Sequence, residues 1–166
     1  MSLILSLDTS TLNCSVALHE KGQLISHELV SEEGSHSKAL TLLIEKAMKT
    51  AGKKLADLAA VAVSNGPGSY TGLRIGLATA KGICFALDKP LICLPTLQIL
   101  ASVVQTPEGF LLLPLLDARR MEVYAAVYDA QLKEMMPQQA HILADDSFQE
   151  YAPLIAFGNG AAKWQA

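Results

Sequence analysis

The most constraining feature of the sequence is a pattern of predicted strands that occurs twice. In the first copy the mostly apolar residues 3–7 lead into Asp8, and in the second the apolar residues 110–116 lead into Asp117. The strands that follow begin at the same spacing from each acid, with Ser15–His19 in the first copy and Tyr124–Tyr128 in the second. Such a repeat predicts two structural units with related topology.

Each copy also contains a later apolar strand that leads into a glycine-rich loop. Residues 59–64 are apolar almost throughout, as expected of a strand covered on both faces, and a glycine-rich loop follows. Residues 154–157 and Gly158-Asn159-Gly160 repeat that order. We therefore expect an α/β fold made of two lobes, each with a mixed sheet flanked by helices. The expected lobes are residues 1–95 and residues 96–166.

The second copy is shorter than the first. Its middle helix is reduced to a segment around residues 147–151, and the sequence ends as the helix after Gly160 begins. A buried strand without a covering helix is unusual in a finished domain. We therefore expect the second lobe to be incomplete and the chain to be truncated at its carboxyl-terminal end.

The periodicity also predicts the remaining elements. After the antiparallel meander of the first three strands, Ser35 is a plausible cap for a helix with one buried stripe. The stripe consists of Leu40, Leu43, Ile44, Ala47 and Ala51. A buried strand is expected over 91–94, a helix over about 96–104, and the third strand of the second copy from Leu132.

The helix predicted over residues 73–87 is apolar on all sides, with Arg74 and Lys81 as its charges. A helix of this kind is buried on both sides, either within its own chain or by sheet on one side and a partner on the other. Gly72, Gly76 and Ala80 are spaced four apart, which allows another helix to approach closely. The face opposite the expected core face consists of Ile75, Ala78, Thr79, Gly82, Phe85 and Ala86.

Two segments could cradle a phosphate. Asp8-Thr9-Ser10-Thr11 places an acid, hydroxyls and backbone amides at a strand end, although a polar hairpin turn has the same composition. Gly66 to Gly72 opens a helix, and Ser69 or Thr71 could cap it; a tight strand-to-helix turn explains the glycines equally well. The spacing matches neither a P-loop nor a dinucleotide fingerprint.

The charge and composition exclude several classes of protein. With 13 basic and 16 acidic residues the net charge is −3, and aromatic residues make up 5%, so direct binding to RNA is not expected. Three cysteines favour a reducing compartment, and the amino terminus lacks the basic flank of a signal peptide. No apolar run is long enough to span a membrane. We expect a cytoplasmic protein without a membrane contact.

The sequence offers no catalytic constellation. The four histidines do not have metal-ligand spacing, and no serine lies in a nucleophile-elbow sequence, so no catalytic residue and no metal site are predicted. Asp117-Ala118-Arg119-Arg120 is a charged hairpin turn that either binds an anion or a partner's acid or is simply solvated.

Three blocks carry a resemblance to a known family along the whole chain. They are Leu7 to Thr11 with Cys14 to Leu18, then Asn65-Gly66-Pro67-Gly68-Ser69-Tyr70-Thr71-Gly72-Leu73-Arg74-Ile75-Gly76, and Asp117-Ala118-Arg119-Arg120-Met121-Glu122-Val123-Tyr124. Together these blocks closely resemble the TsaB (YeaZ) family. The resemblance implies a duplicated actin-like ATPase fold, related to ribonuclease H. The resemblance also implies that members of this family continue beyond the end of this chain.

The family resemblance implies a role in making threonylcarbamoyladenosine beside the anticodon of tRNA. TsaB pairs with its paralogue TsaD, the transferase, and the ATPase TsaE joins the complex. TsaD holds a metal with paired histidines in a segment similar to residues 95–100, and this chain has none there. The resemblance therefore implies a non-catalytic activator without a required cofactor, which contacts tRNA only through the complex.

The resemblance further implies that the helices over 35–51 and 73–87 form the subunit interface, in a heterodimer with TsaD or in a homodimer of the isolated chain. The expected interface residues are His36, Ala39, Leu40, Leu43, Arg74, Ile75, Ala78, Thr79, Gly82, Phe85 and Ala86. The alternative is an actin-like kinase or ATPase that binds magnesium ATP. Its expected nucleotide-binding residues are Asp8, Thr9, Ser10, Thr11, Gly66 and Gly68.

Overall fold

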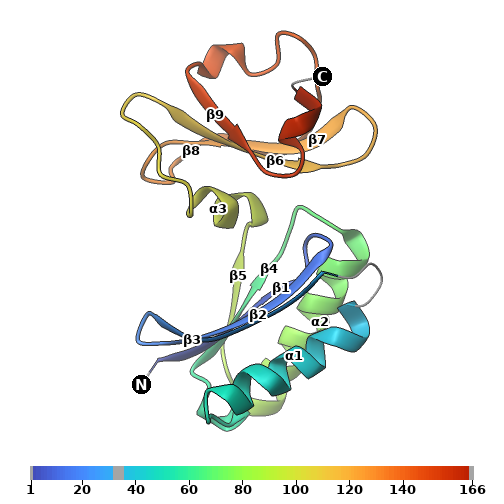
Figure 1. Ribbon diagram of the computed structural model, residues 1–166, viewed down its shortest axis with the longest axis vertical. Coiled ribbons are helices and arrows are strands. Elements are labelled where there is room, and N and C mark those ends of the chain that lie inside the picture. The colour runs from blue at the N-terminus through green and yellow to red at the C-terminus, as the bar shows by residue number, and fades with distance from the viewer. Residues whose placement is uncertain (1, 32–35, 165–166) are drawn as a thin grey trace. The chain divides into compact units, whose positions relative to one another are not determined.

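The computed structural model describes residues 2–31 and 36–164. The chain divides into two compact units, Met1–Leu94 and Pro95–Ala166. Each unit is α/β with one mixed sheet, as predicted (Figure 1). Ser35, the predicted helix cap, lies outside the described residues.

The first unit contains a five-stranded sheet in the order β3-β2-β1-β4-β5. Strands β1, β2 and β3 form the predicted antiparallel meander, whereas β4 and β5 run parallel to β1. The elements are β1 (Leu3–Asp8), β2 (Asn13–Glu20), β3 (Gln23–Ser31), α1 (His36–Thr50), the 3-10 helix η1 (Leu55–Asp57), β4 (Ala60–Ser64), α2 (Tyr70–Leu87) and β5 (Leu91–Leu94).

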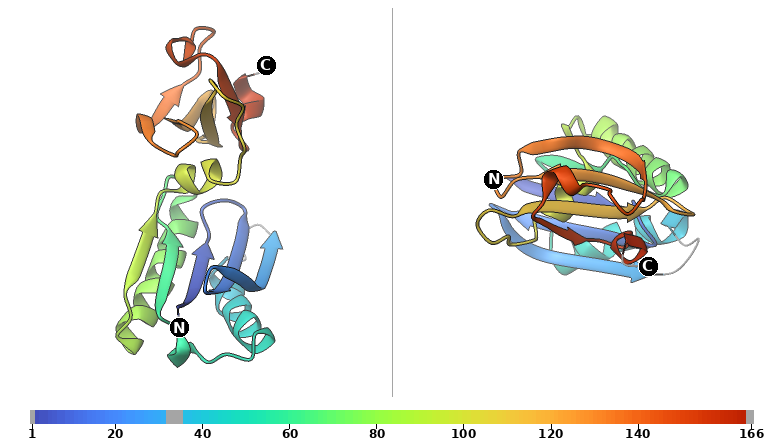
Figure 2. Two further views of the ribbon diagram at one scale, coloured as in Figure 1. Left: turned by 90° about the vertical axis from the view of Figure 1, so that its left-hand side faces the viewer. Right: turned by 90° about the horizontal axis from the view of Figure 1, so that it is seen from above.

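Both helices of this unit cover the same face of the sheet (Figure 1, Figure 2). Successive side chains of a strand point to opposite faces, so Leu3, Leu5 and Leu7 of β1 all turn toward the helices. Leu40 and Ile44 of α1 join them in one buried cluster. The amphipathic stripe predicted for this helix is therefore confirmed.

The second unit contains a four-stranded sheet in the order β8-β7-β6-β9. One face carries Leu112 and Leu116 against α3, and the other carries Leu113 and Leu115 against the 3-10 helices of the unit. The elements are α3 (Thr96–Ala101), β6 (Leu111–Asp117), β7 (Glu122–Tyr128), β8 (Glu134–Ile142), η2 (Gln149–Tyr151), β9 (Leu154–Phe157) and η3 (Ala161–Trp164).

The two units differ in register at their first hairpin. Asp8 pairs with Ser15 in the first unit, and Leu116 pairs with Tyr124 in the second. Asp117 itself pairs with Val123, so the predicted correspondences of Asp117 with Asp8 and of Tyr124 with Ser15 do not hold together. Paired positions enclose an even number of residues in the first hairpin and an odd number in the second, so the registers of the two hairpins differ by one residue. A shift of one residue turns a strand side chain to the other face.

Three smaller expectations also need correction. Strand β5 is not buried: Ile92 and Leu94 are exposed because β5 forms the edge of its sheet. Helix α3 ends at Ala101, earlier than predicted. Strand β8 begins at Glu134 because Leu132 takes a left-handed backbone conformation in the preceding turn.

Candidate functional site

The acid at the end of β1 is held by its neighbours. Oδ1 of Asp8 accepts hydrogen bonds from the Ser64 hydroxyl at 2.9 Å and from the Ser10 backbone amide at 2.8 Å. Ser64 ends β4, which lies beside β1 in the sheet. The carboxylate thus links two parallel strands at their carboxyl ends.

The turn after Asp8 is locked to the start of α2. The Thr9 hydroxyl donates to the Gly72 carbonyl at 2.7 Å, and the Ser69 amide donates to the Ser10 carbonyl at 2.6 Å. Thr9 is completely buried, and Ser10 is 2% exposed. The structure therefore brings together the two segments that the sequence presented as separate phosphate-binding candidates.

The glycines of the second segment make this contact possible. A β-carbon on Gly68 would collide with the Ser10 backbone, and one on Gly72 or Gly76 would collide with Thr9. The glycine stripe therefore admits the β1–β2 turn, and the expectation that it admits another helix is wrong. The turn approaches the helix closely because a backbone carbonyl and a hydroxyl occupy the space where side chains would otherwise project.

Ser69 begins α2 as one of the two predicted caps. Its hydroxyl accepts a hydrogen bond from the Gly72 amide at 3.3 Å. The amides of Ser10, Ser69 and Gly72, which could otherwise bind a phosphate, are thus all used inside the chain. The Ser10 hydroxyl is buried without a hydrogen-bond partner among the described residues.

The expected nucleotide-binding residues therefore form one cluster. Asp8 to Thr11 meet the loop that contains Gly66 and Gly68, and nucleotide binding there stays a prediction.

Burial and the nearby Asp8 carboxylate raise the pKa of the Cys14 thiol, so this thiol is protonated and a poor nucleophile at neutral pH. Within residues 2–31 and 36–164, no group of three or more His, Cys, Asp and Glu side chains could hold a metal ion.

The side of α2 that points away from the sheet is exposed, and its apolar residues lie beside the charged Arg74 and Lys81. We define the outer face of α2 as Ala78, Gly82, Phe85 and Ala86, all of which are exposed. The Phe85 side chain is 93% exposed, more than any other large apolar side chain of the described residues. Ile75, which we expected on this face, is instead partly buried against the core.

The other expected interface residues of α2 flank this face. Thr79 is half-buried and lies on the side toward α1, whereas Arg74 is exposed. The Arg74 guanidinium donates to the Tyr70 hydroxyl at 3.1 Å and lies 5.2 Å from the centre of the Tyr70 ring. This contact on the first turns of the helix holds a cation beside the outer face.

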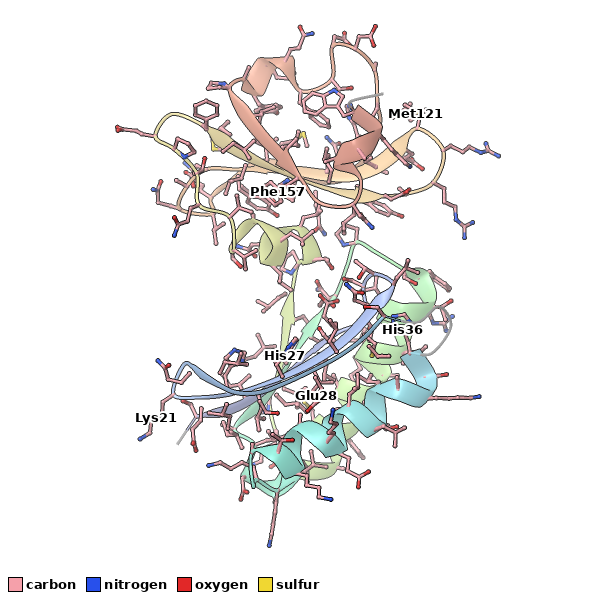
Figure 3. The ribbon with its side chains drawn as sticks, viewed as in Figure 1. Lys21, His27, Glu28, His36, Met121 and Phe157 are labelled. Carbon is pink, nitrogen blue, oxygen red and sulfur yellow. The ribbon has the colours of Figure 1, made fainter. Side chains whose placement is uncertain are left out.

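Two of the four α1 residues that we expected at a partner interface are buried inside the chain. Leu40 is 1% exposed within the core, and His36 is buried with its Nε2 atom 3.0 Å from the Thr11 carbonyl (Figure 3). Ala39 and Leu43 are half-buried. Because Leu40 and Ile44 point into the core, the side of α1 that is open to solvent is centred on other residues.

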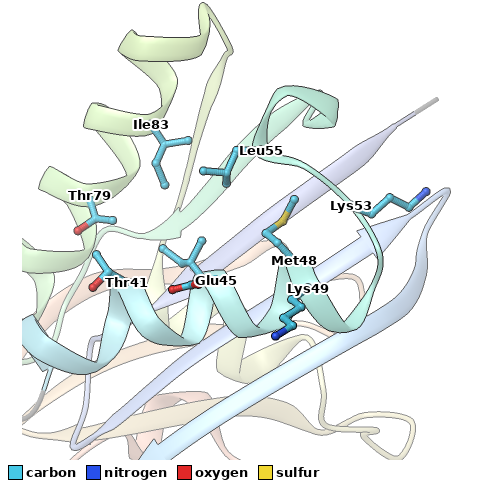
Figure 4. A pocket seen from close by; sticks show the side chains of 9 residues that line it. Thr41, Glu45, Met48, Lys49, Lys53, Leu55, Thr79 and Ile83 are labelled. Atoms are coloured by element: carbon cyan, nitrogen blue, oxygen red, sulfur yellow. The ribbon is translucent and has the colours of Figure 1, made fainter.

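Sequence reasoning missed a groove that opens beside α1. The α1–α2 groove has a volume of about 450 Å³ and lies between the two helices and η1 (Figure 4). Six of its lining residues are Thr41, Glu45 and Met48 of α1, Thr79 and Ile83 of α2, and Leu55. On α1 the groove is also lined by Ile44, and both Ile44 and Met48 belong to the core cluster, so no separate stripe in the sequence marked it.

The second strand end differs from the first. Oδ1 of Asp117 accepts hydrogen bonds from Lys163 at 2.7 Å and from the Arg119 amide at 2.7 Å. The hydrogen bond from Lys163 is the main reason that the pKa of Asp117 is lowered. Arg119 and Arg120 are exposed at the tip of the hairpin.

No helix of the described chain is long and apolar enough to cross a membrane.

A family model and curated relatives that match this chain are all named for threonylcarbamoyladenosine in tRNA. The family model described as "TsaD: tRNA N6-adenosine threonylcarbamoyltransferase" matches residues 25–164. The tRNA threonylcarbamoyladenosine biosynthesis protein TsaB of Bacillus subtilis is 32% identical over 86% of this chain and 63% of its own length. The TsaB protein of Escherichia coli is 38% identical over 75% of this chain and 54% of its own length. The chain thus spans between half and two thirds of these curated relatives.

Solved structures agree with this result. The structure of YeaZ from Pseudomonas aeruginosa matches with a TM-score of 0.74 and 32% identity, over 89% of this chain and 69% of that chain. An activator of 2-hydroxyisocaproyl-CoA dehydratase from Clostridium difficile matches with a TM-score of 0.50 and 12% identity, over 85% of this chain and 45% of that chain. The latter likeness concerns the fold alone, and the expected duplicated actin-like ATPase fold is confirmed.

Proposed function

Because the chain belongs to the TsaB (YeaZ) family, we propose that it serves in the biosynthesis of threonylcarbamoyladenosine in tRNA as a non-catalytic subunit. In this proposal the chain binds and activates a TsaD transferase, and the ATPase TsaE joins the same complex. The isolated chain pairs with a second copy through the same surface, and tRNA is contacted through the complex.

The observation that carries the proposal is the exposed outer face of α2. Its four residues, Ala78, Gly82, Phe85 and Ala86, form an apolar strip that the exposed Arg74 and Lys81 flank along one edge. Contiguous exposed apolar surface is typical of a protein–protein contact. Burial of a phenylalanine side chain contributes about 1.5–3 kcal/mol to association, so Phe85 is the expected anchor of the contact.

The adjoining α1–α2 groove extends this surface. Its lining combines the apolar Met48, Leu55 and Ile83 with the charged Glu45, Lys49 and Lys53. Apolar side chains next to charged ones are common in specific protein interfaces. The groove is therefore the part of the surface that we expect to receive a side chain of the partner.

The non-catalytic role is supported by residues 95–100. The sequence there is Pro-Thr-Leu-Gln-Ile-Leu. The resemblance implies that a TsaD transferase carries paired metal-binding histidines in the equivalent segment, and this chain has none there. None of these side chains can hold a metal ion in the way that imidazole does. The transfer chemistry is accordingly assigned to the partner and not to this chain.

The interface is tested by Gly82→Glu, with Gly82→Ala as the matched control. A β-carbon at Gly82 meets nothing within 4 Å, so both variants fit the folded chain. An unpaired carboxylate buried in a contact costs several kcal/mol, and we expect the affinity for purified TsaD of the same organism to fall at least about hundredfold. Calorimetric titration measures this loss, and unchanged affinity of the Glu variant would contradict the proposal.

The non-catalytic role is tested by Asp8→Asn. Both hydrogen bonds to Asp8 reach Oδ1, and an asparagine oxygen can accept the same two, so the fold is retained. We expect threonylcarbamoyl transfer by the reconstituted complex to stay within about twofold of the native rate. Loss of transfer with intact TsaD binding would assign a chemical role to this chain.

A specific observation favours a second candidate function, an actin-like kinase or ATPase activity. The Ser10 hydroxyl is buried and has no hydrogen-bond partner among the described residues, and it lies beside Asp8 and Gly68. A phosphate oxygen could use that hydroxyl once the turn opens, because the hydroxyl is buried in the described conformation. Calorimetry of the chain with magnesium ATP separates the two functions: saturable heat that Asp8→Asn abolishes supports this candidate, and absence of heat removes it.

A further inference from the structure

The tip of the β6–β7 hairpin has a hollow that the proposed function does not use. The hollow has a volume of about 580 Å³ and is lined by the turn and by the end of β8. Met121 marks its position at the hairpin tip in Figure 3. The lining residues are Ala118, Arg119, Arg120, Met121, Glu122 and Ile142.

The backbone of this turn is strained in a way that displays both arginines. Arg119 has a φ of 78° and Arg120 a φ of 49°, so two successive non-glycine residues are left-handed. The turn between β2 and β3 shows the common solution, since Gly22 occupies one of its two left-handed positions. Asparagine and glycine adopt this conformation with less strain than arginine. Backbone strain of this kind is concentrated at functional sites, so it indicates a function for the two side chains.

The charges of the two arginines are not neutralised nearby. Among the residues that the structure describes, neither guanidinium lies within ion-pair distance of a carboxylate. Asp117, the nearest acid before the turn, is bonded to Lys163 and to the Arg119 backbone amide. Glu122 also lines the hollow, and its side chain forms no ion pair with a described residue.

Apolar side chains lie beside these charges. Met121 is 51% exposed and Ile142 is 72% exposed, and both line the same hollow as the arginines. Arginine and methionine are enriched at protein interfaces, where arginine binds carboxylates in a bidentate geometry. A phosphate backbone would not use the apolar neighbours, and the net charge of −3 disfavours a nucleic acid.

From these contacts we propose that the Arg119–Arg120 turn is a docking site for an acidic segment of a partner protein. The segment carries an aspartate or glutamate that pairs with a guanidinium, next to a large apolar side chain that packs on Met121 and Ile142. This site is on a different unit from the outer face of α2, so either surface can fail its test without the other.

The proposal is tested with the double variant Arg119→Asn/Arg120→Gly, whose residues suit the left-handed backbone and leave the fold intact. The probe is a short fluorescent peptide in which Asp and Leu alternate, and the control peptide has Asn in place of Asp. We expect the double variant to bind the Asp peptide at least about tenfold more weakly, and the native chain to prefer the Asp peptide by a similar factor.

Four results decide the proposal. Equal binding of the Asp and Asn peptides by the native chain would overturn it, as would equal binding of the Asp peptide by native chain and double variant. A single-stranded RNA that binds more tightly than the Asp peptide, with a steep salt dependence that the double variant loses, would replace the acidic protein with a nucleic acid. The double Lys variant Arg119→Lys/Arg120→Lys should bind less well than the native chain because lysine lacks the bidentate geometry.

Discussion

The turns that follow β1 and β6 occupy related places in the two sheets but differ in what they contact. Thr9 is 0% exposed and Ser10 is 2% exposed, and both are bonded to the start of α2. Arg119 and Arg120 are exposed and bind no other element through their side chains among the described residues. The first turn thus fixes a helix whose outer face is left open, whereas the second turn is itself open.

The glycines explain the difference. In the first unit Gly68, Gly72 and Gly76 approach the turn residues, whereas in the second Gly158 and Gly160 approach the strand residues before the turn. The Gly160 amide donates to the Leu115 carbonyl at 3.0 Å, and the Asp117 amide donates to the Asn159 side chain at 3.0 Å. The second loop therefore holds the strand end and leaves the hairpin tip free.

The largest expected effect breaks the contact between turn and helix in the first unit. In Gly72→Val the new side chain meets the Thr9 backbone, which cannot move without displacing β1 or α2. We expect the free energy of unfolding to fall by about 3 kcal/mol or more, as measured by urea denaturation. Gly82→Ala is the control, and it should leave stability unchanged or raise it by up to about 1 kcal/mol.

Equal stability of Gly72→Val and Gly82→Ala would show that the turn and the helix are not in close contact. The comparison between the two strand ends would then lose its basis.

A smaller effect is expected from Thr9→Val, which keeps the shape of the side chain and removes its hydroxyl donor to the Gly72 carbonyl. The carbonyl is left without this partner in a buried place, so the free energy of unfolding should fall by about 1–2 kcal/mol. Thr71→Val, at an exposed position of the same helix, is the matched control and should change stability by less than about 0.5 kcal/mol. Similar losses in both variants would show that the Thr9 hydrogen bond does not contribute.

The smallest effect concerns the second strand end and depends on pH. The lowered pKa of Asp117 means that its pairing with Lys163 stabilises the fold above the pKa of the unfolded chain, and that this contribution is lost as pH falls through the folded pKa. The pair is partly exposed, so Asp117→Asn should reduce stability by less than about 1 kcal/mol at pH 7.

Urea denaturation of both chains at several pH values checks this expectation. The difference between the native chain and Asp117→Asn should shrink as pH falls below about 4, where the unfolded carboxyl becomes protonated. A difference that is constant down to acid pH would mean that the charge of Asp117 is not its source.

Periodicity predicted the parts of this fold that depend on local pattern. The meander, the buried β4 and the core stripe of α1 follow from side-chain alternation and helical spacing. The partner of the glycine stripe could not be found in this way, because Thr9 and Gly72 are far apart in the sequence. The difference in register between the two hairpins was equally hidden, since a change of one hairpin residue does not disturb the apolar pattern on either side.

For the candidate site, the sequence predicted the exposed face of α2 but did not separate core from surface on α1. The exposure of Ala78, Gly82 and Phe85 agrees with the second apolar face seen in the sequence, whereas Leu40 of α1 belongs to the core. Two neighbouring stripes of one helix cannot be assigned to core and surface until the sheet beneath it is known. For that reason the groove beside Thr41 and Met48 is visible only in the structure.

The central claim is that the inner face of α2 holds the fold while the outer face holds a partner, and Phe85→Ser tests it most directly. The unfolding free energy and the affinity for TsaD should be measured on the same preparation. Because Phe85 is 93% exposed, we predict that the free energy of unfolding changes by less than about 0.5 kcal/mol while the affinity falls by about tenfold to hundredfold. Unchanged affinity, or a loss of affinity that merely follows a loss of stability, would contradict the account.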